Sequence, residues 1–508
     1  MSAQQLKGRK VLITAYDLEQ SEHRGIAVYS KSLVRCLYEA GAEVWLLTEF
    51  FDKLSEKGLK LLPKSTQEMI RNARILNSLA LGRRERPSTL LQRKFKLARK
   101  AKQWGNYFRL IFNLLRRPRR YKARDLNSFR LQELYDNPYV RIERLDFLEC
   151  VTGIVSAPEL YLSTQLAAQL PNLRPVQIDL SDFDTLITTC PLNISPYNLQ
   201  TFVQTIHDLI PLEYVAHNED PLMFSHRLQA CLPARKLFVS QSTANKFQVH
   251  IQNTSKRASL QTARPTDSAH EAVIIQSPSL RFPSWLTEDP DKIADLKPVS
   301  YLLQDEATGR ANTISDSRKA LTPFRYFLFN SSVEARKNLL FLAKAYAESD
   351  LNALGIKLCV TGKLKGDEYS NALKEIVAHA PGIILTGYVD ESSKLDLYLN
   401  ALGLLSPSLV EGFGIPVLDG ACLGAPTIAS DCESHLEIQS LHDFDKHVLC
   451  FDTLDSREWA AALQAVAGSK RQLGVEPAKT RRERIGRYCQ FQTTFTNQLR
   501  RDLVSILN

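Results

Sequence analysis

A short stretch between residues 406 and 438 has residue types suited to binding an anion. The apolar run 402–405 before it is typical of the end of a buried parallel strand. Gly412 and Gly414 then allow a sharp bend and a close approach of the backbone to a ligand, because neither has a Cβ. Pro416 suits the first turn of a helix, where outward-pointing amides stabilise an anion. The stretch therefore predicts a strand end, a glycine turn and a helix start.

Two carboxylates flank this turn. Glu411 comes directly before it, and Asp419 follows eight residues later, about two helical turns into the predicted helix. This spacing predicts two acids around a hole of the size of a phosphate. The same residues would also suit an ordinary glycine turn with a capping acid.

The whole stretch resembles the signature of the family-four retaining glycosyltransferases, PSxxEGFGLPxLEAMAxGxPV. It matches at Pro407, Ser408, Glu411, Gly412, Phe413, Gly414, Pro416, Gly424 and Pro426. It departs at Asp419, where the family usually has a second Glu. The resemblance implies that Glu411 hydrogen-bonds the hydroxyls of a donor sugar, and that Asp419 reaches the ribose of the nucleotide.

The beginning of the chain has the pattern of a doubly wound α/β domain. Residues 10–15 predict a strand, a polar loop and a helix follow, and residues 43–48 predict the next strand. The run HRGIAVYSKSLVRCL resembles the family's GGIGRYTxxLxxAL loop, which implies that the Gly25 amide approaches the donor phosphates. Arg24 stands where the family often has Gly.

Further candidate strands cover residues 185–189 and 202–206, and His207 follows the second of them. A histidine at the carboxyl end of a parallel strand lies where ligands bind in this fold class. The run IHDLIPLEY resembles a segment of mannosyl- and glucosyltransferases in which a His contacts the donor sugar. A core or capping histidine is the alternative interpretation.

A second α/β domain begins with the apolar strand 325–329. The run NSSVEARKN after it resembles the family's GTxExRKN turn, which implies that Arg336 and Lys337 neutralise the nucleotide diphosphate. Two basic residues at a helix entrance could equally be a solvated surface pair.

Two more predicted strands, 357–362 and 383–389, precede the signature. The second resembles the family's TGYV segment beside the nucleotide base. The resemblance thus implies catalytic roles for Glu411 and His207. The donor-binding residues that it implies are Gly25, Arg336, Lys337, Gly362, Tyr388, Val389, Gly412, Phe413, Gly414, Ile415 and Asp419.

The predicted fold class is α/β, with two Rossmann-like doubly wound domains facing a cleft (GT-B) and a basic helical insertion in the first domain. The predicted domains are 1–310, with the insertion at about 52–150 and a polar linker at about 285–320; 320–485, which binds the nucleotide sugar; and a C-terminal helix, 486–508, crossing back to the first domain.

The resemblance implies a metal-independent hexosyltransferase that retains configuration and uses a nucleotide-diphosphate sugar as co-substrate, with no cofactor. It favours mannose or a similar hexose, and a glycan or lipid-linked acceptor in cell-surface polysaccharide or lipopolysaccharide assembly. Because Arg24, Asn330 and Asp419 depart from donor-site motifs, a catalytically inactive sugar-nucleotide-binding protein is the alternative.

The charge of the chain is concentrated in residues 83–124. This segment has sixteen Lys and Arg against one acid, whereas the net charge of the whole chain is only +10. Residues 90–115 place Phe95, Trp104 and Phe108 on one apolar stripe of a predicted basic helix. The helix could pack on its own domain, lie on an anionic membrane surface, or bind nucleic acid. No nucleic-acid-binding module surrounds it, so we predict no nucleic-acid partner.

Composition predicts the compartment. The nine cysteines include no CxxC pair, and the ten histidines have no metal-ligand spacing, so we expect reduced thiols and no metal site. Residues 107–115 form the longest apolar run and include Arg109, so we expect no membrane span, and the N-terminus has no secretory pattern. These features predict a cytoplasmic protein, peripheral on the inner face of the plasma membrane.

Overall fold

The computed structural model of the 508-residue chain describes residues 5–20, 25–51, 60–81, 108, 110–112, 114, 119–135, 146–169, 174–214, 219–258, 271–289, 292, 302–303, 320–473 and 476–508. The chain divides into two compact α/β units. The N-terminal unit consists of Met1–Val239, Ala244–Gln276 and Thr496–Asn508, and the C-terminal unit of Ser240–Thr243 and Ser277–Phe495.

The N-terminal unit is built on an eight-stranded sheet in the order β11–β10–β9–β7–β1–β2–β5–β4. All pairs are parallel except β4 with β5. The chain builds the sheet outwards from β1 on one side and from β7 on the other, so a topological switch point lies between β1 and β7. The strands are β1 (Lys10–Thr14), β2 (Glu43–Thr48), β4 (Asn127–Arg130), β5 (Gly153–Ser156), β7 (Thr185–Thr188), β9 (Thr201–Ile206), β10 (Arg235–Phe238) and β11 (Glu271–Val273).

Helices and a second, smaller sheet complete this unit. In α1 (Gly25–Glu39), apolar residues at three- and four-residue steps bury Leu33, Val34 and Leu37. The smaller sheet consists of β3 (Arg120–Tyr121), β6 (Val176–Asp179) and β8 (Ile194–Tyr197), and its Ile178 and Ile194 join the core beside Leu12. The other helices are α2 (Lys64–Leu81), α4 (Gln132–Tyr135), α5 (Leu160–Gln169), α6 (Ile210–Glu213), α7 (Pro221–Ala230) and α8 (Gln241–Ala258).

The C-terminal unit has a six-stranded, fully parallel sheet in the order β14–β13–β12–β15–β16–β17. Numbered along the chain this is 3-2-1-4-5-6, the Rossmann order, with its switch point between β12 and β15. The strands are β12 (Tyr326–Asn330), β13 (Lys357–Thr361), β14 (Ile383–Gly387), β15 (Gly403–Ser406), β16 (Thr427–Ser430) and β17 (Val448–Phe451). The predicted pair of doubly wound α/β domains is confirmed; the cleft between them stays a prediction.

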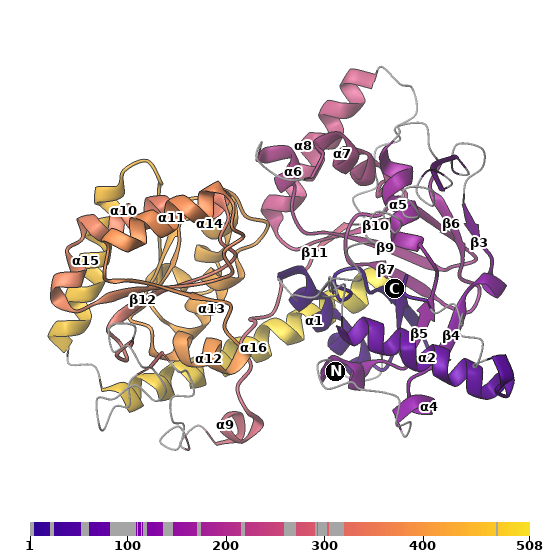
Figure 1. Ribbon diagram of the computed structural model, residues 1–508, viewed down its shortest axis with the longest axis horizontal. Helices are drawn as coiled ribbons and strands as arrows, with labels where there is room; N and C mark the ends of the chain where they lie inside the picture. Colours follow the sequence, from indigo (N-terminus) through magenta and orange to yellow (C-terminus); the bar gives the residue numbers. More distant parts are fainter. Residues whose placement is uncertain are drawn as a thin grey trace. The chain divides into compact units, whose positions relative to one another are not determined.

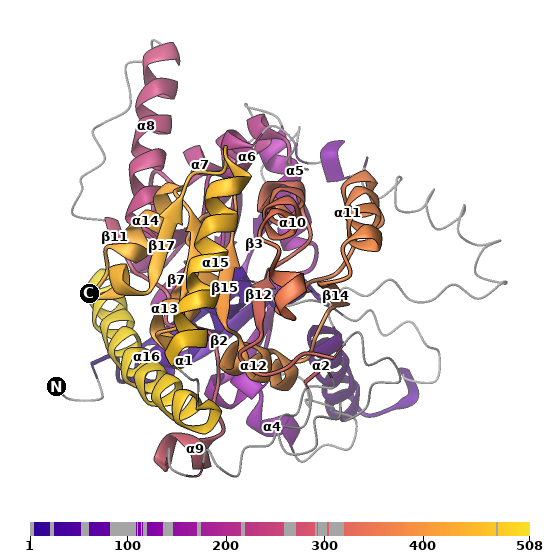
Figure 2. The same cartoon turned by 90° about the vertical axis from the view of Figure 1, so that its left-hand side faces the viewer.

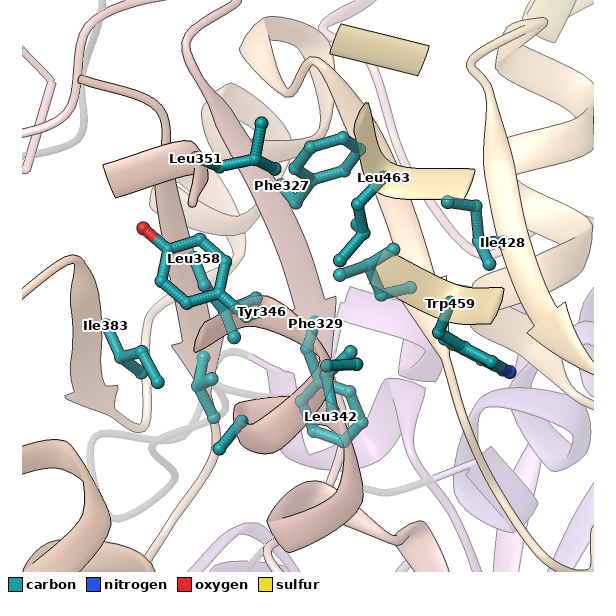
Figure 3. Close-up of a cluster of buried hydrophobic side chains, with 14 of the residues drawn as sticks. Phe327, Phe329, Leu342, Tyr346, Leu351, Leu358, Ile383, Ile428, Trp459 and Leu463 are labelled. Atoms are coloured by element: carbon teal, nitrogen blue, oxygen red, sulfur yellow. The ribbon is translucent and has the colours of Figure 1, made fainter. Parts of the chain in front are cut away.

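Helices cover both faces of this sheet (Figure 1). Helices α10 (Leu339–Glu348), α11 (Glu368–His379) and α15 (Ser456–Leu473) pack together over one face, and α12 (Glu391–Asn400) and α13 (Ile415–Leu423) over the other. Figure 3 shows the core on the α10 side, where Phe327 and Phe329 from β12 meet Leu342 and Trp459. Because Trp459 is fully buried, truncation to alanine would cost about 3–5 kcal/mol.

The last helix, α16 (Pro477–Leu507), is one continuous element of 31 residues (Figure 2). It starts nine residues before the predicted 486. In the C-terminal unit, Arg484 is buried and donates to the carbonyls of Leu399 and Ala401 at 2.9 and 2.8 Å, at the end of α12. A cation is favourable there because the carbonyl end of a helix is partly negative. From Thr496 onwards the helix belongs to the N-terminal unit, where Arg9 donates to the carbonyl of Leu507.

The boundary between the units falls at Gln276 and Ser277, earlier than the predicted 310–320. The reason is local, because Ser279 and Leu280 hydrogen-bond to side chains of α13 and α16 in the C-terminal unit. Most of the predicted linker, 285–320, lies outside the described residues; α9 (Ser284–Glu288) is the helix described in it.

Most of the basic segment 83–124 also lies outside the described residues, including Phe95 and Trp104. Of residues 108–114, those described are helical, and Leu110 and Leu114 pack against Leu166 of α5. The prediction of a helical insertion at about 52–150 is wrong for 120–130, where β3 and β4 join the two sheets of the N-terminal unit; for the residues outside the described part it stays a prediction. Among the described helices, none combines the length and the hydropathy that a membrane span requires.

Candidate functional site

The switch point of the C-terminal sheet brings together three of the predicted residues. Arg336 and Lys337 lie in a short 3-10 turn, η7 (Ala335–Lys337), shortly after β12, and Glu411 follows β15. Because β12 and β15 are parallel neighbours, both segments leave the sheet at the same edge. Arg336 Nη1 lies 3.3 Å from Glu411 Oε2, and Lys337 Nζ pairs with Glu411 Oε1.

Burial makes these ion pairs strong. The side chain of Glu411 is 10% exposed and that of Lys337 is 7% exposed. Burial alone would raise the pKa of Glu411, but Lys337 and Arg336 outweigh it and bring this pKa to about 2. Burial lowers the pKa of Lys337, and Glu411 opposes the shift. Glu411 is thus a carboxylate at physiological pH, paired with two cations.

Sequence reasoning missed a second acid in this cluster. Glu334 lies 3.1 Å from Arg336 Nε and 2.7 Å from Lys365 Nζ. Burial tends to raise its pKa, but Lys365 and Arg336 lower it overall. The position of Glu334 two residues before Arg336 could have indicated it, but only the basic residues of this stretch were given a role. Lys365 carried no signal, because it comes from the loop after β13.

The glycine turn has the backbone that the sequence predicted. Gly414 has φ +102° and directly precedes α13, and a Cβ there would lie 2.8 Å from His435 Cδ2. The carbonyl of Glu411 accepts a hydrogen bond from Ser434 Oγ at 2.8 Å, which fixes the peptide that leads into the turn. At the start of α13, Pro416 has no N–H, and the amides of Val417 and Leu418 donate to the carbonyl of Gly414, so an anion would be attracted by the positive end of the helix dipole.

His435 is a further residue that the sequence did not single out. It is fully buried, and its Nδ1 lies 3.0 Å from the Oγ of Ser430. Burial lowers its pKa to about 4, against the opposing effect of Glu411. A neutral imidazole therefore packs beneath Gly414.

Asp419 is buried, and both of its carboxylate oxygens accept hydrogen bonds from other residues of the chain. Its Oδ1 accepts hydrogen bonds from the amide of Ser279 and the hydroxyl of Tyr488, each at 2.7 Å, and its Oδ2 accepts one from Ser279 Oγ at 2.5 Å. Burial raises its pKa, against the opposing effect of these hydrogen bonds. Its contact with a ribose stays a prediction.

The neighbouring strands place the remaining C-terminal candidates at the same edge. Gly362 directly follows β13 with φ +137°, and a Cβ there would lie 2.1 Å from the carbonyl oxygen of Ser331, so only glycine fits. Tyr388 and Val389 follow β14; Tyr388 is 68% exposed and Val389 is buried. Phe413, in the turn, is buried. Their contacts with a donor stay predictions.

The N-terminal unit holds the other two candidates. His207 follows β9, and its Nε2 lies 2.8 Å from the carbonyl oxygen of Thr189. Burial lowers the pKa of His207 to about 4, against the opposing effect of this hydrogen bond. Gly25 is the exposed first residue of α1; residues 21–24, with Arg24, lie outside the described part.

The sequence pattern of one protein family, glycosyl transferases group 1, matches residues 325–468. This range includes the complete six-stranded sheet, the two cations and the glycine turn. Residues 325–468 form a glycosyl transferases group 1 domain. No curated protein sequence matches the chain.

Solved structures resemble the chain weakly over nearly its full length. Sucrose-phosphate synthase from Thermosynechococcus elongatus aligns at TM-score 0.48 and 12% identity, covering 96% of this chain and 97% of that one. HepE from Anabaena, in complex with UDP, aligns at TM-score 0.49 and 12% identity. WaaG, a glycosyltransferase involved in lipopolysaccharide biosynthesis, aligns at TM-score 0.48 and 12% identity. Each of these alignments covers 96% of this chain and 98% of the other protein's chain. TM-scores below 0.5 add nothing to the family match.

Arg336, Lys337 and Glu411 place charged side chains at the switch point of the glycosyl transferases group 1 domain. Among the described residues, no three His, Cys, Asp or Glu side chains are grouped so that they could hold a metal ion. Independence from metal stays a prediction. What the cluster of Arg336, Lys337 and Glu411 can do is bind an anion while a carboxylate orients a neighbouring polar group.

Proposed function

We propose that the protein is a retaining glycosyltransferase that moves mannose or a similar hexose from a nucleotide-diphosphate sugar to an acceptor hydroxyl. One observation carries the proposal: Arg336 and Lys337 flank Glu411 at the switch point of a glycosyl transferases group 1 domain. Ligands of open α/β sheets bind at such points, outside the carboxyl ends of the strands.

The cations would stabilise the leaving group. When the bond between sugar and phosphate breaks, negative charge develops on the diphosphate, and fixed positive groups lower the energy of that state. Arg336 and Lys337 are held by carboxylates before any ligand arrives, so little reorganisation is needed. The helix-start amides after Gly414 would add partial positive charge.

Glu411 would accept hydrogen bonds from the sugar hydroxyls, since its low pKa keeps it ionised. His207 would contact the donor sugar from the N-terminal unit. With no nucleophile assigned on the other face of the sugar, the leaving phosphate would take the acceptor proton. Two protein cations would replace the metal ion that other transferases use, and Gly25, Gly362, Tyr388, Val389 and Asp419 would complete the donor site.

We further propose that the acceptor is a glycan or a lipid-linked glycan, and that the basic segment 83–124 holds the enzyme on the inner face of the plasma membrane. Each Lys or Arg near an anionic surface contributes ~1 kcal/mol. Vesicles containing anionic lipid should sediment the intact protein but not a variant lacking 83–107, which leaves the Leu110 and Leu114 packing in place. Equal sedimentation of both would refute this.

A panel of UDP- and GDP-hexoses, with release of nucleoside diphosphate as the readout, tests the proposal. The wild type should release UDP or GDP from one donor, and Glu411→Gln should do so at least about tenfold more slowly, ~1.4 kcal/mol in transition-state stabilisation. A donor that binds without being turned over would favour the inactive sugar-nucleotide-binding protein instead. Turnover that is unchanged in Glu411→Gln would refute its role.

A further inference from the structure

Residues 408–414, the glycine loop, are held by the segment that follows the neighbouring strand, β16. Ser430 ends β16, and its Oγ donates to the carbonyl of Ser408 at 2.5 Å, at the beginning of the loop. Helix α14 (Glu433–Gln439) follows, and Ser434 in its first turn is 1% exposed. Because β15 and β16 are parallel neighbours, the glycine loop and the start of α14 leave the sheet at the same edge.

The hydroxyl of Ser434 is shared between two consecutive carbonyls of the glycine loop. Its Oγ lies 2.8 Å from the carbonyl oxygen of Glu411 and 3.2 Å from that of Gly412, so one O–H donates to both. The Gly412 carbonyl also accepts from Ser240 Oγ at 2.8 Å, a residue of the same compact unit. Among the described residues, the carbonyl of Glu411 has its hydrogen bond from Ser434 alone.

The loop is fixed independently on either side of this carbonyl. Before it, the amide of Leu409 donates to the carbonyl of Arg336 at 2.8 Å. After it, Gly414 packs against the ring of His435. Between these points, the residue that follows Glu411 is a glycine, whose missing Cβ lets the main chain shift at little steric cost. The serine hydroxyl therefore supplies a restraint that steric contacts do not.

Glu411 is thus held at two ends. Its carboxylate pairs with Arg336 and Lys337, and its main chain is held by Ser434. A bound diphosphate would compete for the two cations, because its own negative charge pairs with them. With such a ligand in place, the hydrogen bond to the main chain would carry more of the restraint on the carboxylate.

We propose that Ser434 is a positioning residue for Glu411. Its hydroxyl holds the main chain of Glu411 while the diphosphate draws on Arg336 and Lys337, so that the carboxylate stays directed at the donor sugar. The nature of this ligand rests on the proposed function; the restraint of the glycine loop by Ser434 does not.

Ser434→Ala removes this hydroxyl and changes nothing else in the side chain. A catalytic group that moves by about 1 Å can lose about a hundredfold in rate, so kcat should fall at least about tenfold. KM for the donor and Kd for UDP should stay within about twofold of the wild type, because Arg336 and Lys337 are unchanged.

The same hydrogen bond could serve only to stabilise the fold. The matched control is Ser349→Ala, because Ser349 is 2% exposed and its Oγ donates to the carbonyl of Tyr346 at 2.6 Å, at the end of α10. Both variants lose one buried hydroxyl that donates to a carbonyl, so both should lower the midpoint of chemical denaturation to a similar extent. Only Ser434→Ala should lower kcat.

Hydrogen exchange of the full-length protein, followed by mass spectrometry, reports the restraint without any substrate. The amides of residues 411–414 should exchange at least about tenfold faster in Ser434→Ala than in the wild type. In Ser349→Ala these amides should exchange as in the wild type.

Unchanged exchange of 411–414 in Ser434→Ala would overturn the proposal, as would equal kcat for Ser434→Ala and Ser349→Ala. If Ser434→Ala does not fold, Ser434→Cys takes its place with the same readouts, since a thiol is only a weak donor. A wild type that releases UDP or GDP from no donor would refute the proposed function instead, and the exchange comparison would still decide whether Ser434 restrains the loop.

Discussion

Replacing Glu411 with glutamine removes one negative charge from a buried cluster while keeping the size of the side chain. In the wild type that charge pairs with Lys337 and with Arg336. Glutamine leaves both cations without this partner, although Arg336 keeps Glu334. We expect the unliganded C-terminal unit to lose stability and to bind diphosphate more tightly, because the ligand then supplies the missing charge.

The size of the loss follows from the pKa. Lowering the pKa of Glu411 from 4.5 to about 2 corresponds to about 3 kcal/mol of stabilisation of the ionised form at neutral pH. This agrees with the ~3–5 kcal/mol that breaking a buried ion pair usually costs. The folded-state pKa is depressed, so the contribution is complete above pH 4.5 and is lost as the pH falls towards 2.

Chemical denaturation of the wild type and Glu411→Gln at pH 7 and pH 3 measures how much the ionised Glu411 contributes to the free energy of unfolding. The two proteins should differ by about 3 kcal/mol at pH 7 and by less at pH 3. Glu334→Gln is the matched control, because Glu334 also pairs with Arg336 but is 21% exposed, so its loss should be smaller. Calorimetry with inorganic pyrophosphate and UDP should give tighter binding to Glu411→Gln. A stability difference below about 1 kcal/mol at pH 7, or weaker binding of pyrophosphate, would refute this reasoning.

Three further outcomes are expected. Replacing Arg336 and Lys337 together with alanine should weaken UDP or GDP at least about tenfold more than the corresponding nucleoside, since charge-assisted contacts are lost; equal weakening would give both residues a structural role. His435→Gln should flatten the pH dependence of stability between pH 4 and 6.5. In the wild type the folded-state pKa of about 4 means that the unfolded chain binds the extra proton first, so stability falls on acidification by up to about 1.4 kcal/mol per pH unit. Parallel curves of stability against pH for the wild type and the variant would contradict this. Asp419→Asn should cost about 1–3 kcal/mol of stability, because it disturbs the buried hydrogen bonds with Ser279 and Tyr488. If Asp419 also contacts a ribose, the substitution should weaken the binding of UDP more than the binding of pyrophosphate.

The elements of both units could be predicted because their signals are local. The β2 strand, residues 43–48, has the bounds that its apolar run predicted, and β12, predicted at 325–329, lies at Tyr326–Asn330. The glycine turn was predictable for the same reason, because the φ of +102° at Gly414 is a property that only glycine adopts without strain. The small β3–β6–β8 sheet was missed, since its strands are short and one of its two pairs, β3 with β6, joins segments about 57 residues apart (Arg120 with Gln177).

The role of Asp419 depends on contacts that no spacing reveals. Its partners Ser279 and Tyr488 are 140 and 69 residues away, and they occupy the carboxylate that the resemblance assigned to a ribose. Glu334 was overlooked for the same reason, because its ion-pair partner Lys365 lies on the loop after another strand, β13. Distant partners of this kind depend on which strands become neighbours.

The sequence by itself determined which residues follow each strand: Arg336 and Lys337 after one, Glu411 after another, and His207 after a third. Chain-local periodicity and glycine chemistry are sufficient for that. Only the tertiary structure decided that β12 lies beside β15, and β1 beside β7, because strand order results from the packing of whole layers. That order buries Lys337 against Glu411, depresses the pKa of the carboxyl group, and joins Thr14 to Thr189 beneath His207.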